Sequence, residues 1–127
     1  MDNLIQKVLI VDDEPAFRKF LKTIIEKELK IEAFEAKDPI DAFDFLEKFT
    51  PNLIILDMEM PVMDGFTALI KLRSMPDKSN IPVIACTALS SSSLLRGLLK
   101  LNISDYIVKP SNAATILAKI KKALNNY

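Results

Sequence analysis

The chain has 127 residues, half of them hydrophobic, which is the size of one domain that can bury a substantial core. Its 17 basic and 17 acidic side chains leave no net charge, and this balance argues against a nucleic-acid-binding domain. The single cysteine excludes an internal disulfide, and the absence of histidine excludes a histidine base, metal ligand or phosphocarrier within the chain.

The sequence contains no segment that would direct it to a membrane. No apolar run approaches the roughly 20 residues of a membrane-spanning helix, and no signal peptide is recognisable. A lone cysteine also fits a reducing compartment. We therefore expect a cytoplasmic protein, and because no linker or internal repeat is evident, one domain over residues 1–127.

Short apolar segments rich in β-branched residues recur along the chain. They predict strands at residues 8–11, 31–36, 53–56, 83–86 and 106–108. Continuous apolarity is typical of strands that are buried on both faces, whereas residues 31–36 alternate between apolar and polar, as in an edge strand.

Amphipathic helices are predicted between and after these strands. Their expected starts are Pro15, Asp38-Pro39, Asp64-Gly65, Ser90 to Ser93, and Ser111 or Asn112. Their apolar positions are Phe17, Leu21, Ile24 and Ile25; Ile40, Phe43, Leu46 and Phe49; Leu69, Ile70 and Leu72; Leu94, Leu98 and Leu101; and Ile116, Leu117, Ile120 and Leu124. The alternation of strands and helices predicts an α/β fold with a parallel sheet and right-handed crossovers. On the last helix, Lys119, Lys121 and Lys122 are expected to form a solvated face.

Polar residues follow the predicted strands at the point where each strand ends. Asp12 and Asp13 come after the first strand, Asp57 after the third, Thr87 after the fourth and Lys109 after the fifth. In a parallel sheet these ends share one edge, which is where ligands bind in open α/β folds. We therefore expect the five side chains to converge.

Three carboxylates at adjoining strand ends, Asp12, Asp13 and Asp57, would repel one another. At about 4 Å and an effective dielectric near 20, each pair costs on the order of 4 kcal/mol. A cation would neutralise the cluster, and all-oxygen ligands favour Mg²⁺, or Mn²⁺ as the alternative, over zinc. With the positive charge of Lys109 and the hydroxyl of Thr87, this set predicts a phosphoryl-transfer site whose nucleophile is a carboxylate.

Four motifs then match a known family in order and over almost the whole chain. The sequence resembles the receiver domains of two-component response regulators, chemotaxis-type single-domain receivers in particular, at residues 9–15 (LIVDDEP), 56–65 (LDMEMPVMDG), 87–88 (TA) and 106–110 (YIVKP). The resemblance implies a flavodoxin-like, doubly wound sandwich with five helices and a five-stranded parallel sheet in the order 2-1-3-4-5.

The resemblance also implies roles for the carboxylates. Asp57 would accept a phosphoryl group from the phosphohistidine of a sensor histidine kinase or a phosphotransfer protein. Asp12 and Asp13 would position Mg²⁺ together with Asp57 and the backbone carbonyl of Glu59. The Glu59 side chain, and that of Leu89, would stand at variable positions that line the mouth of the pocket and tune the phosphoryl lifetime.

The remaining motif residues would couple the phosphoryl group to a change of shape. Lys109 would pair with the phosphoryl group, Thr87 would swing toward it, and Tyr106 would rotate inward to follow. The Lys109–Pro110 bond is cis in such domains, and Asn102 replaces a glycine that receivers often carry. A downstream target protein or output domain would read the change, with no direct contact to nucleic acid.

The predicted fourth helix carries more leucine than one face can bury. Leu94, Leu98 and Leu101 form one stripe, whereas Leu95 and Leu99 point about 100° away. An exposed apolar patch often marks an interface. We therefore predict that Leu95 and Leu99 belong to a partner surface that responds to phosphorylation.

Two other functions compete with a signalling switch. A haloacid-dehalogenase-like phosphatase also places a nucleophilic aspartate after an apolar strand, but it usually has a second aspartate where this chain has Glu59. A degenerate receiver that acts only as a binding module is disfavoured by the intact set of Asp57, Thr87 and Lys109. We expect a phosphoacceptor domain that assists its own phosphorylation and dephosphorylation, and not an enzyme in the usual sense.

Overall fold

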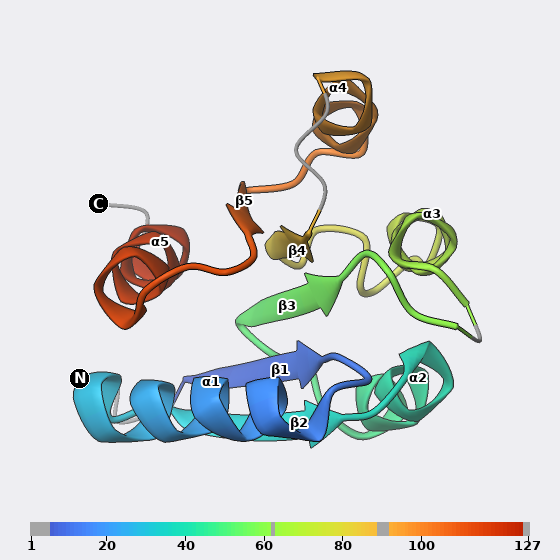
Figure 1. Cartoon of the computed structure of the whole chain (residues 1–127). Helices are drawn as coiled ribbons and strands as arrows, with labels where there is room; N and C mark the ends of the chain where they lie inside the picture. The colour runs from blue at the N-terminus through green and yellow to red at the C-terminus, as the bar shows by residue number, and fades with distance from the viewer. Residues whose placement is uncertain (1–5, 62, 89–91, 126–127) are drawn as a thin grey trace.

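The computed structural model describes residues 6–61, 63–88 and 92–125, in which strands and helices alternate (Figure 1). The elements lie close to their predicted places. Their bounds are β1 Lys7–Val11, α1 Pro15–Leu29, β2 Glu32–Ala36, α2 Pro39–Lys48, β3 Leu53–Asp57, α3 Gly65–Arg73, β4 Val83–Thr87, α4 Ser92–Lys100, β5 Asp105–Val108 and α5 Ala113–Asn125.

The strands form one parallel sheet in the order β2-β1-β3-β4-β5, which confirms the order that the resemblance implied. Strand β2 lies at one edge and mixes exposed, half-buried and buried positions, whereas β3 and β4 are buried throughout. The prediction of an edge strand is therefore confirmed. Because all strands run the same way, their carboxyl ends meet at one edge of the sheet.

Helices cover both faces of the sheet, and the sheet separates the core into two clusters (Figure 1). Leu21 of α1 and Ile116 of α5 are fully buried against one face. Leu46 of α2, Leu69 of α3 and Leu98 of α4 are buried against the other face. This three-layer arrangement buries the strands on both sides, which explains why their sequences are apolar almost without interruption.

Side-chain caps start three of the helices where the sequence predicted. Asp38, Asp64 and Asn112 each accept a hydrogen bond, at 2.8 Å, from the backbone N–H three residues later. Such caps satisfy amide groups that have no partner inside the helix. Pro15 is the first residue of α1, as expected. Helix α4 begins at Ser92, and the predicted cap positions Ser90 and Ser91 lie outside the described residues.

Two expectations about the backbone are also confirmed. Asn102, just beyond α4, has a φ of 60°, a left-handed conformation that asparagine tolerates better than most residues. The Lys109–Pro110 peptide bond is cis.

Two of the apolar residues that marked the predicted helices face solvent. Ile40 and Ile70 are 55% and 57% exposed. The buried face of α2 is formed instead by Pro39, Ala42 and Leu46. Adjacent helical residues point about 100° apart, so a face centred on Pro39 turns Ile40 outward. In α3 the buried Leu69 turns its neighbour Ile70 outward in the same way.

Arg73, at the end of α3, links the α3–β4 connection to the α4–β5 connection through hydrogen bonds to backbone oxygens. Its guanidinium donates at 2.8 to 3.0 Å to the backbone oxygens of Ser79, Ile81, Leu101 and Asn102. Burial lowers the pKa of Arg73 from its ordinary value. The planar fork of donors suits this role because it reaches several carbonyl groups at once.

Among the described residues, no helix combines the length and the apolar character that crossing a bilayer requires.

Candidate functional site

The sheet itself positions the predicted site residues. Asp57 and Thr87 are the last residues of β3 and β4, and Asp12 and Lys109 directly follow β1 and β5. Backbone hydrogen bonds extend the ladder past the strand ends, with Lys109 N donating to Thr87 O at 2.8 Å and Asp12 N to Ala36 O at 3.1 Å. The strand ends therefore converge as predicted, and backbone hydrogen bonds hold the residues that follow them.

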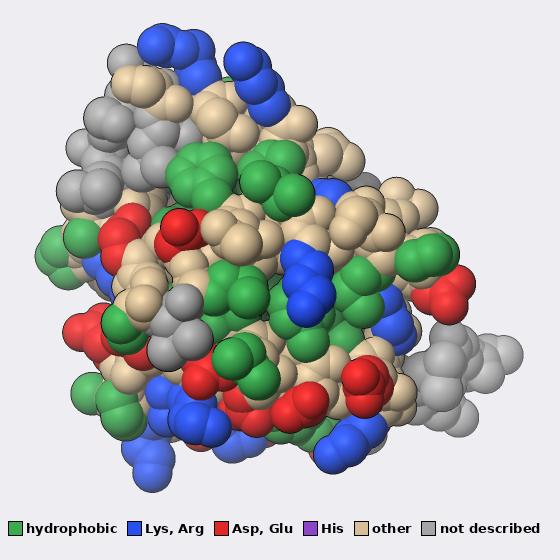
Figure 2. All heavy atoms as spheres, turned by 90° about the vertical axis from the view of Figure 1, so that its right-hand side faces the viewer, with side chains coloured by type: hydrophobic (Ala, Val, Ile, Leu, Met, Phe, Trp, Pro, Cys, Tyr) green, Lys and Arg blue, Asp and Glu red, His purple; other side chains and the backbone are tan. Residues whose placement is uncertain are grey.

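Asp12, Asp13 and Asp57 form a close acidic cluster. One carboxylate oxygen from each lies within 4.8 Å of the other two. Asp12 and Asp57 are 2% and 3% exposed, whereas Asp13 is exposed. Asp12 is further oriented by the Glu14 amide, which donates to its Oδ1 at 2.8 Å. Two buried carboxylates beside a third, exposed one make an oxygen-only donor set open to solvent on one side. Acidic side chains are frequent on the side of the molecule toward which β1 and β3 point (Figures 1 and 2).

Lys109 supplies the positive charge of this cluster. Its Nζ lies 2.9 Å from Asp12 Oδ2, 3.3 Å from Glu14 Oε1 and 3.7 Å from Asp57 Oδ1. The same group sits over the Phe17 ring, 4.5 Å from its centroid. Burial alone would lower the pKa of Lys109, but the hydrogen bonds and charges of Asp12, Asp57 and Glu14 together outweigh burial and raise it. Lys109 is therefore a permanent cation here, and its nearest partner is Asp12 rather than Asp57.

The acceptor candidate, Asp57, has a strongly perturbed acidity. Burial raises the pKa of Asp57 to about 7, and the charge of Asp12 adds to the rise. The Glu59 amide, which donates to Asp57 Oδ1 at 3.2 Å, and the charge of Lys109 act in the opposite direction. A divalent cation beside Asp57 would favour its ionised form, because opposite charges stabilise a carboxylate.

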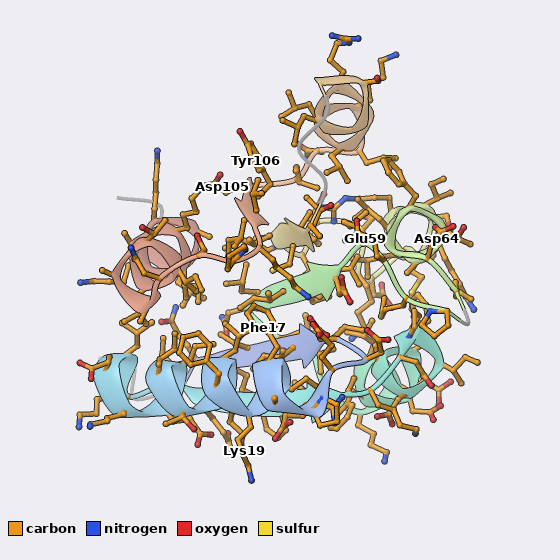
Figure 3. The ribbon with its side chains drawn as sticks, in the orientation of Figure 1. Phe17, Lys19, Glu59, Asp64, Asp105 and Tyr106 are labelled. Carbon is orange, nitrogen blue, oxygen red and sulfur yellow. The ribbon has the colours of Figure 1, made fainter. Side chains whose placement is uncertain are left out.

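Thr87 and Glu59 are joined directly. Thr87 is fully buried at the end of β4, and its hydroxyl donates to Glu59 Oε2 at 2.5 Å. The Ala88 amide donates to Glu59 Oε1 at 2.9 Å. Figure 3 shows Glu59 between the end of β4 and α3. The sequence predicted Glu59 at the mouth of the pocket, but not that its side chain would bind Thr87 and Ala88. The other predicted mouth residue, Leu89, lies outside the described residues.

Tyr106 is half-buried on β5 and is held by α5. Lys119 Nζ lies 5.0 Å from the centroid of the Tyr106 ring and donates to the Tyr106 carbonyl at 2.7 Å. It also lies 3.2 Å from Asp105 Oδ1. The expectation that Lys119 belongs to a solvated face is therefore wrong, because α5 packs beside β5 and brings this lysine onto the strand.

The leucines of α4 divide less cleanly than predicted. Leu98 is fully buried and Leu99 is 64% exposed, in agreement with the two expected faces. Leu95 is half-buried and packs against the core. The side chain of Leu94 lies outside the described residues. Of the α4 leucines whose side chains the structure describes, Leu99 is the exposed one.

Sequence reasoning missed two supports of the site. A Cβ on Gly65 would lie 2.6 Å from the Asp57 carbonyl oxygen, so only glycine lets α3 start this close to β3. Arg18 donates to the Asp12 carbonyl at 2.7 Å and to Glu35 Oε1 at 3.1 Å. The Asp64-Gly65 pair at the start of α3 was a visible signal for the first support. The second depends on how α1 packs beside β2 and carries no local signature.

Comparisons with known proteins agree with this geometry. The family model described as "Response regulator receiver domain" matches residues 8–121. The chemotaxis protein CheY of Bacillus subtilis is 33% identical over 119 residues, which cover 94% of this chain and 98% of that protein. Among solved structures, chemotaxis protein CheY4 of Vibrio cholerae superposes with a TM-score of 0.89 at 26% identity, covering 95% of this chain and all of that one.

Other relatives are longer proteins. The probable transcriptional regulator ycf27 of Porphyridium aerugineum is 34% identical over 119 residues, but these are only 48% of its length. A receiver domain from a signal transduction histidine kinase of Syntrophus aciditrophicus superposes with a TM-score of 0.85 at 33% identity, covering 95% of this chain and 91% of that chain. The matched family, the sheet order and the convergent site agree, and the chain belongs to the response regulator receiver domains of two-component signalling.

Proposed function

We propose that Asp57 is the phosphoacceptor of this receiver domain and that its phosphorylation switches the surface around β5 and α4. The observation that carries the proposal is the surroundings of Asp57, a buried carboxylate that lies 3.7 Å from Lys109 Nζ and next to two further carboxylates. A pKa raised to about 7 by burial is typical of a functional carboxyl group.

The acidic cluster suits a hard divalent cation. Asp12, Asp13 and Asp57, with the backbone carbonyl of Glu59, would hold Mg²⁺, and Mn²⁺ would be accepted as well. The fit rests on three carboxylate oxygens within 4.8 Å of one another and on the lack of a thiolate or imidazole in the cluster. When bound, the cation would supply charge neutralisation for the carboxylates and for an incoming phosphoryl group.

Asp57, Lys109 and Thr87 would each have a separate role in phosphoryl transfer. An oxygen of Asp57 forms the new bond to phosphorus while the phosphorus–nitrogen bond of a donor phosphohistidine breaks, and the electron pair stays on the imidazole nitrogen. Lys109 neutralises developing negative charge on the phosphoryl oxygens, and the Thr87 hydroxyl donates to one of them. Both groups already stand at the same edge of the sheet as Asp57.

The proposed switch requires a phosphoryl donor and a partner that reads the change. The donor would be a sensor histidine kinase or a phosphotransfer protein, and the reader a target protein or an output domain. Thr87 and Tyr106 would couple the phosphoryl group to the readout surface, with Leu95 and Leu99 of α4 as part of that surface. The exposure of Leu99 supports its inclusion, whereas Leu95 would contribute mainly through packing.

The test is phosphorylation of the wild-type protein and of Asp57→Asn with acetyl phosphate and Mg²⁺. Intact-mass spectrometry should detect one added phosphoryl group in the wild type and none in the variant. Omission of Mg²⁺, by chelation, should abolish the gain. A phosphoryl group on Asp57→Asn, or none on the wild type, would refute the assignment.

A further inference from the structure

The carboxylate of Glu59 bridges two hydrogen-bond donors at the end of β4. Its Oε2 accepts from the Thr87 hydroxyl at 2.5 Å, and its Oε1 accepts from the Ala88 amide at 2.9 Å. A carboxylate that engages two donors with two oxygens forms a charge-assisted pair of contacts, each stronger than a neutral hydrogen bond.

Those two donors lie next to the acceptor carboxylate. Asp57 pairs with Cys86 in the sheet register, one residue before Thr87, and Met58 N donates to Cys86 O at 2.8 Å. The Glu59 amide in turn donates to Asp57 Oδ1 at 3.2 Å. The backbone N–H of Glu59 is thus bonded to Asp57, while its side chain accepts from the two donors of the neighbouring strand end.

We propose that Glu59 is an internal competitor of the phosphoryl group, holding the Thr87 and Ala88 donors until an anion on Asp57 displaces it. The inference rests on the proposed function and adds a residue that sets how strongly the site holds a tetrahedral anion. Glu59 is a positioning residue, because it acts on the phosphoryl group through Thr87 and Ala88.

The physical basis is that one donor pair cannot serve two anions. Two oxygens of a phosphoryl group on Asp57 would need the contacts that the two oxygens of Glu59 already make. Glu59 also carries like charge, so the two groups repel each other while both are near Thr87. Glu59 is exposed, so its side chain can turn into solvent and release the hydroxyl of the fully buried Thr87.

The same contacts would instead strengthen anion binding if Glu59 held the Thr87 hydroxyl in the orientation that the anion needs. It would then hold the Thr87 hydroxyl turned toward the pocket, and its removal would weaken anion binding by freeing that hydroxyl. Competition and preorganisation therefore predict effects of opposite sign on affinity, which makes one titration decisive.

The experiment is a titration with beryllofluoride in the presence of Mg²⁺, followed through the backbone amide resonances of Ala88 and Asp57. The variants are Glu59→Ala and Glu59→Gln, with Glu28→Gln as a charge-matched control on the exposed end of α1. We expect Glu59→Ala to bind beryllofluoride at least about tenfold more tightly than wild type, because the variant lacks the two charge-assisted contacts that the anion must displace. Glu59→Gln should fall between the two, and Glu28→Gln should match wild type.

A second measurement needs no ligand. Hydrogen exchange of the Ala88 amide should be faster in Glu59→Ala than in wild type, because its carboxylate acceptor is gone. An unchanged exchange rate would overturn the contact itself. Equal or weaker beryllofluoride binding by Glu59→Ala, with normal binding by wild type, would overturn only the competition. Failure of wild type to bind beryllofluoride would overturn the proposed function and this inference together.

Discussion

Replacing Asp57 by asparagine should stabilise the metal-free protein at alkaline pH. The variant removes a charge that the folded state must bury, since Asp57 is 3% exposed. Its pKa rises from 3.8 to about 7, with burial as the largest cause and the charge of Asp12 as a further one. Asparagine keeps nearly the same shape and an oxygen that can accept from the Glu59 amide.

The direction follows from proton binding. Between about pH 4 and pH 7 the folded state holds a proton on Asp57 that the unfolded state has released, so the free energy of unfolding falls as the pH rises. Above the folded pKa the loss is complete. A shift of about three pH units at about 1.4 kcal/mol each corresponds to roughly 4 kcal/mol, an upper limit because neighbouring groups relax.

The assay is urea unfolding, followed by far-ultraviolet circular dichroism in a chelating buffer. We expect the free energy of unfolding of Asp57→Asn to exceed that of wild type by about 2–4 kcal/mol near pH 8, and by close to nothing near pH 3, where wild-type Asp57 is largely protonated in both states. Mg²⁺ near pH 8 should stabilise wild type more than the variant, because binding to the folded state adds to its stability. A variant that is no more stable than wild type near pH 8 would refute the reasoning.

Three further substitutions test how the site is supported. Gly65→Ala should cost about 1–3 kcal/mol, measured by the same unfolding assay, because its Cβ meets the Asp57 carbonyl at 2.6 Å; an unchanged midpoint would contradict the close approach. Arg73→Ala should cost about 3 kcal/mol by leaving backbone oxygens unpaired, and Arg73→Lys should recover only part of it, since one ammonium cannot reach four carbonyls. Leu98→Ala should cost about 2–5 kcal/mol, whereas Leu99→Ala should stay within about 0.5 kcal/mol; equal losses would show that α4 is oriented differently.

Local sequence determined most of the framework of this protein. Apolar, β-branched segments predicted the strands because a strand buried on both faces needs no polar positions. Asp38 and Asp64 predicted helix starts because a short carboxylate can satisfy the first free amides of a helix. The placement of Asp12, Asp57, and Lys109 directly after strands predicted their convergence, because parallel strands end at one edge. The order of the strands came from the family resemblance, since alternation alone allows several orders.

Pairwise contacts inside the site were decided only by tertiary structure. The preference of Lys109 for Asp12 over Asp57 depends on distances that differ by less than 1 Å, and strand ends do not encode such differences. Packing of α5 on β5 likewise drew Lys119 onto Tyr106, and the angular position of α2 turned Ile40 to solvent.

The raised pKa of Asp57 and the position of the Glu59 side chain were also decided by tertiary structure. Burial is the largest cause of the raised pKa of Asp57, and burial is a property of the packed layers around β3 rather than of the residues beside it in sequence. Glu59 reaches Thr87 and Ala88 because β3 and β4 lie side by side, although nearly thirty residues separate the partners in the chain. Sequence thus determined which groups meet at this edge, and the fold decided which of them are paired and how burial shifts the pKa of Asp57.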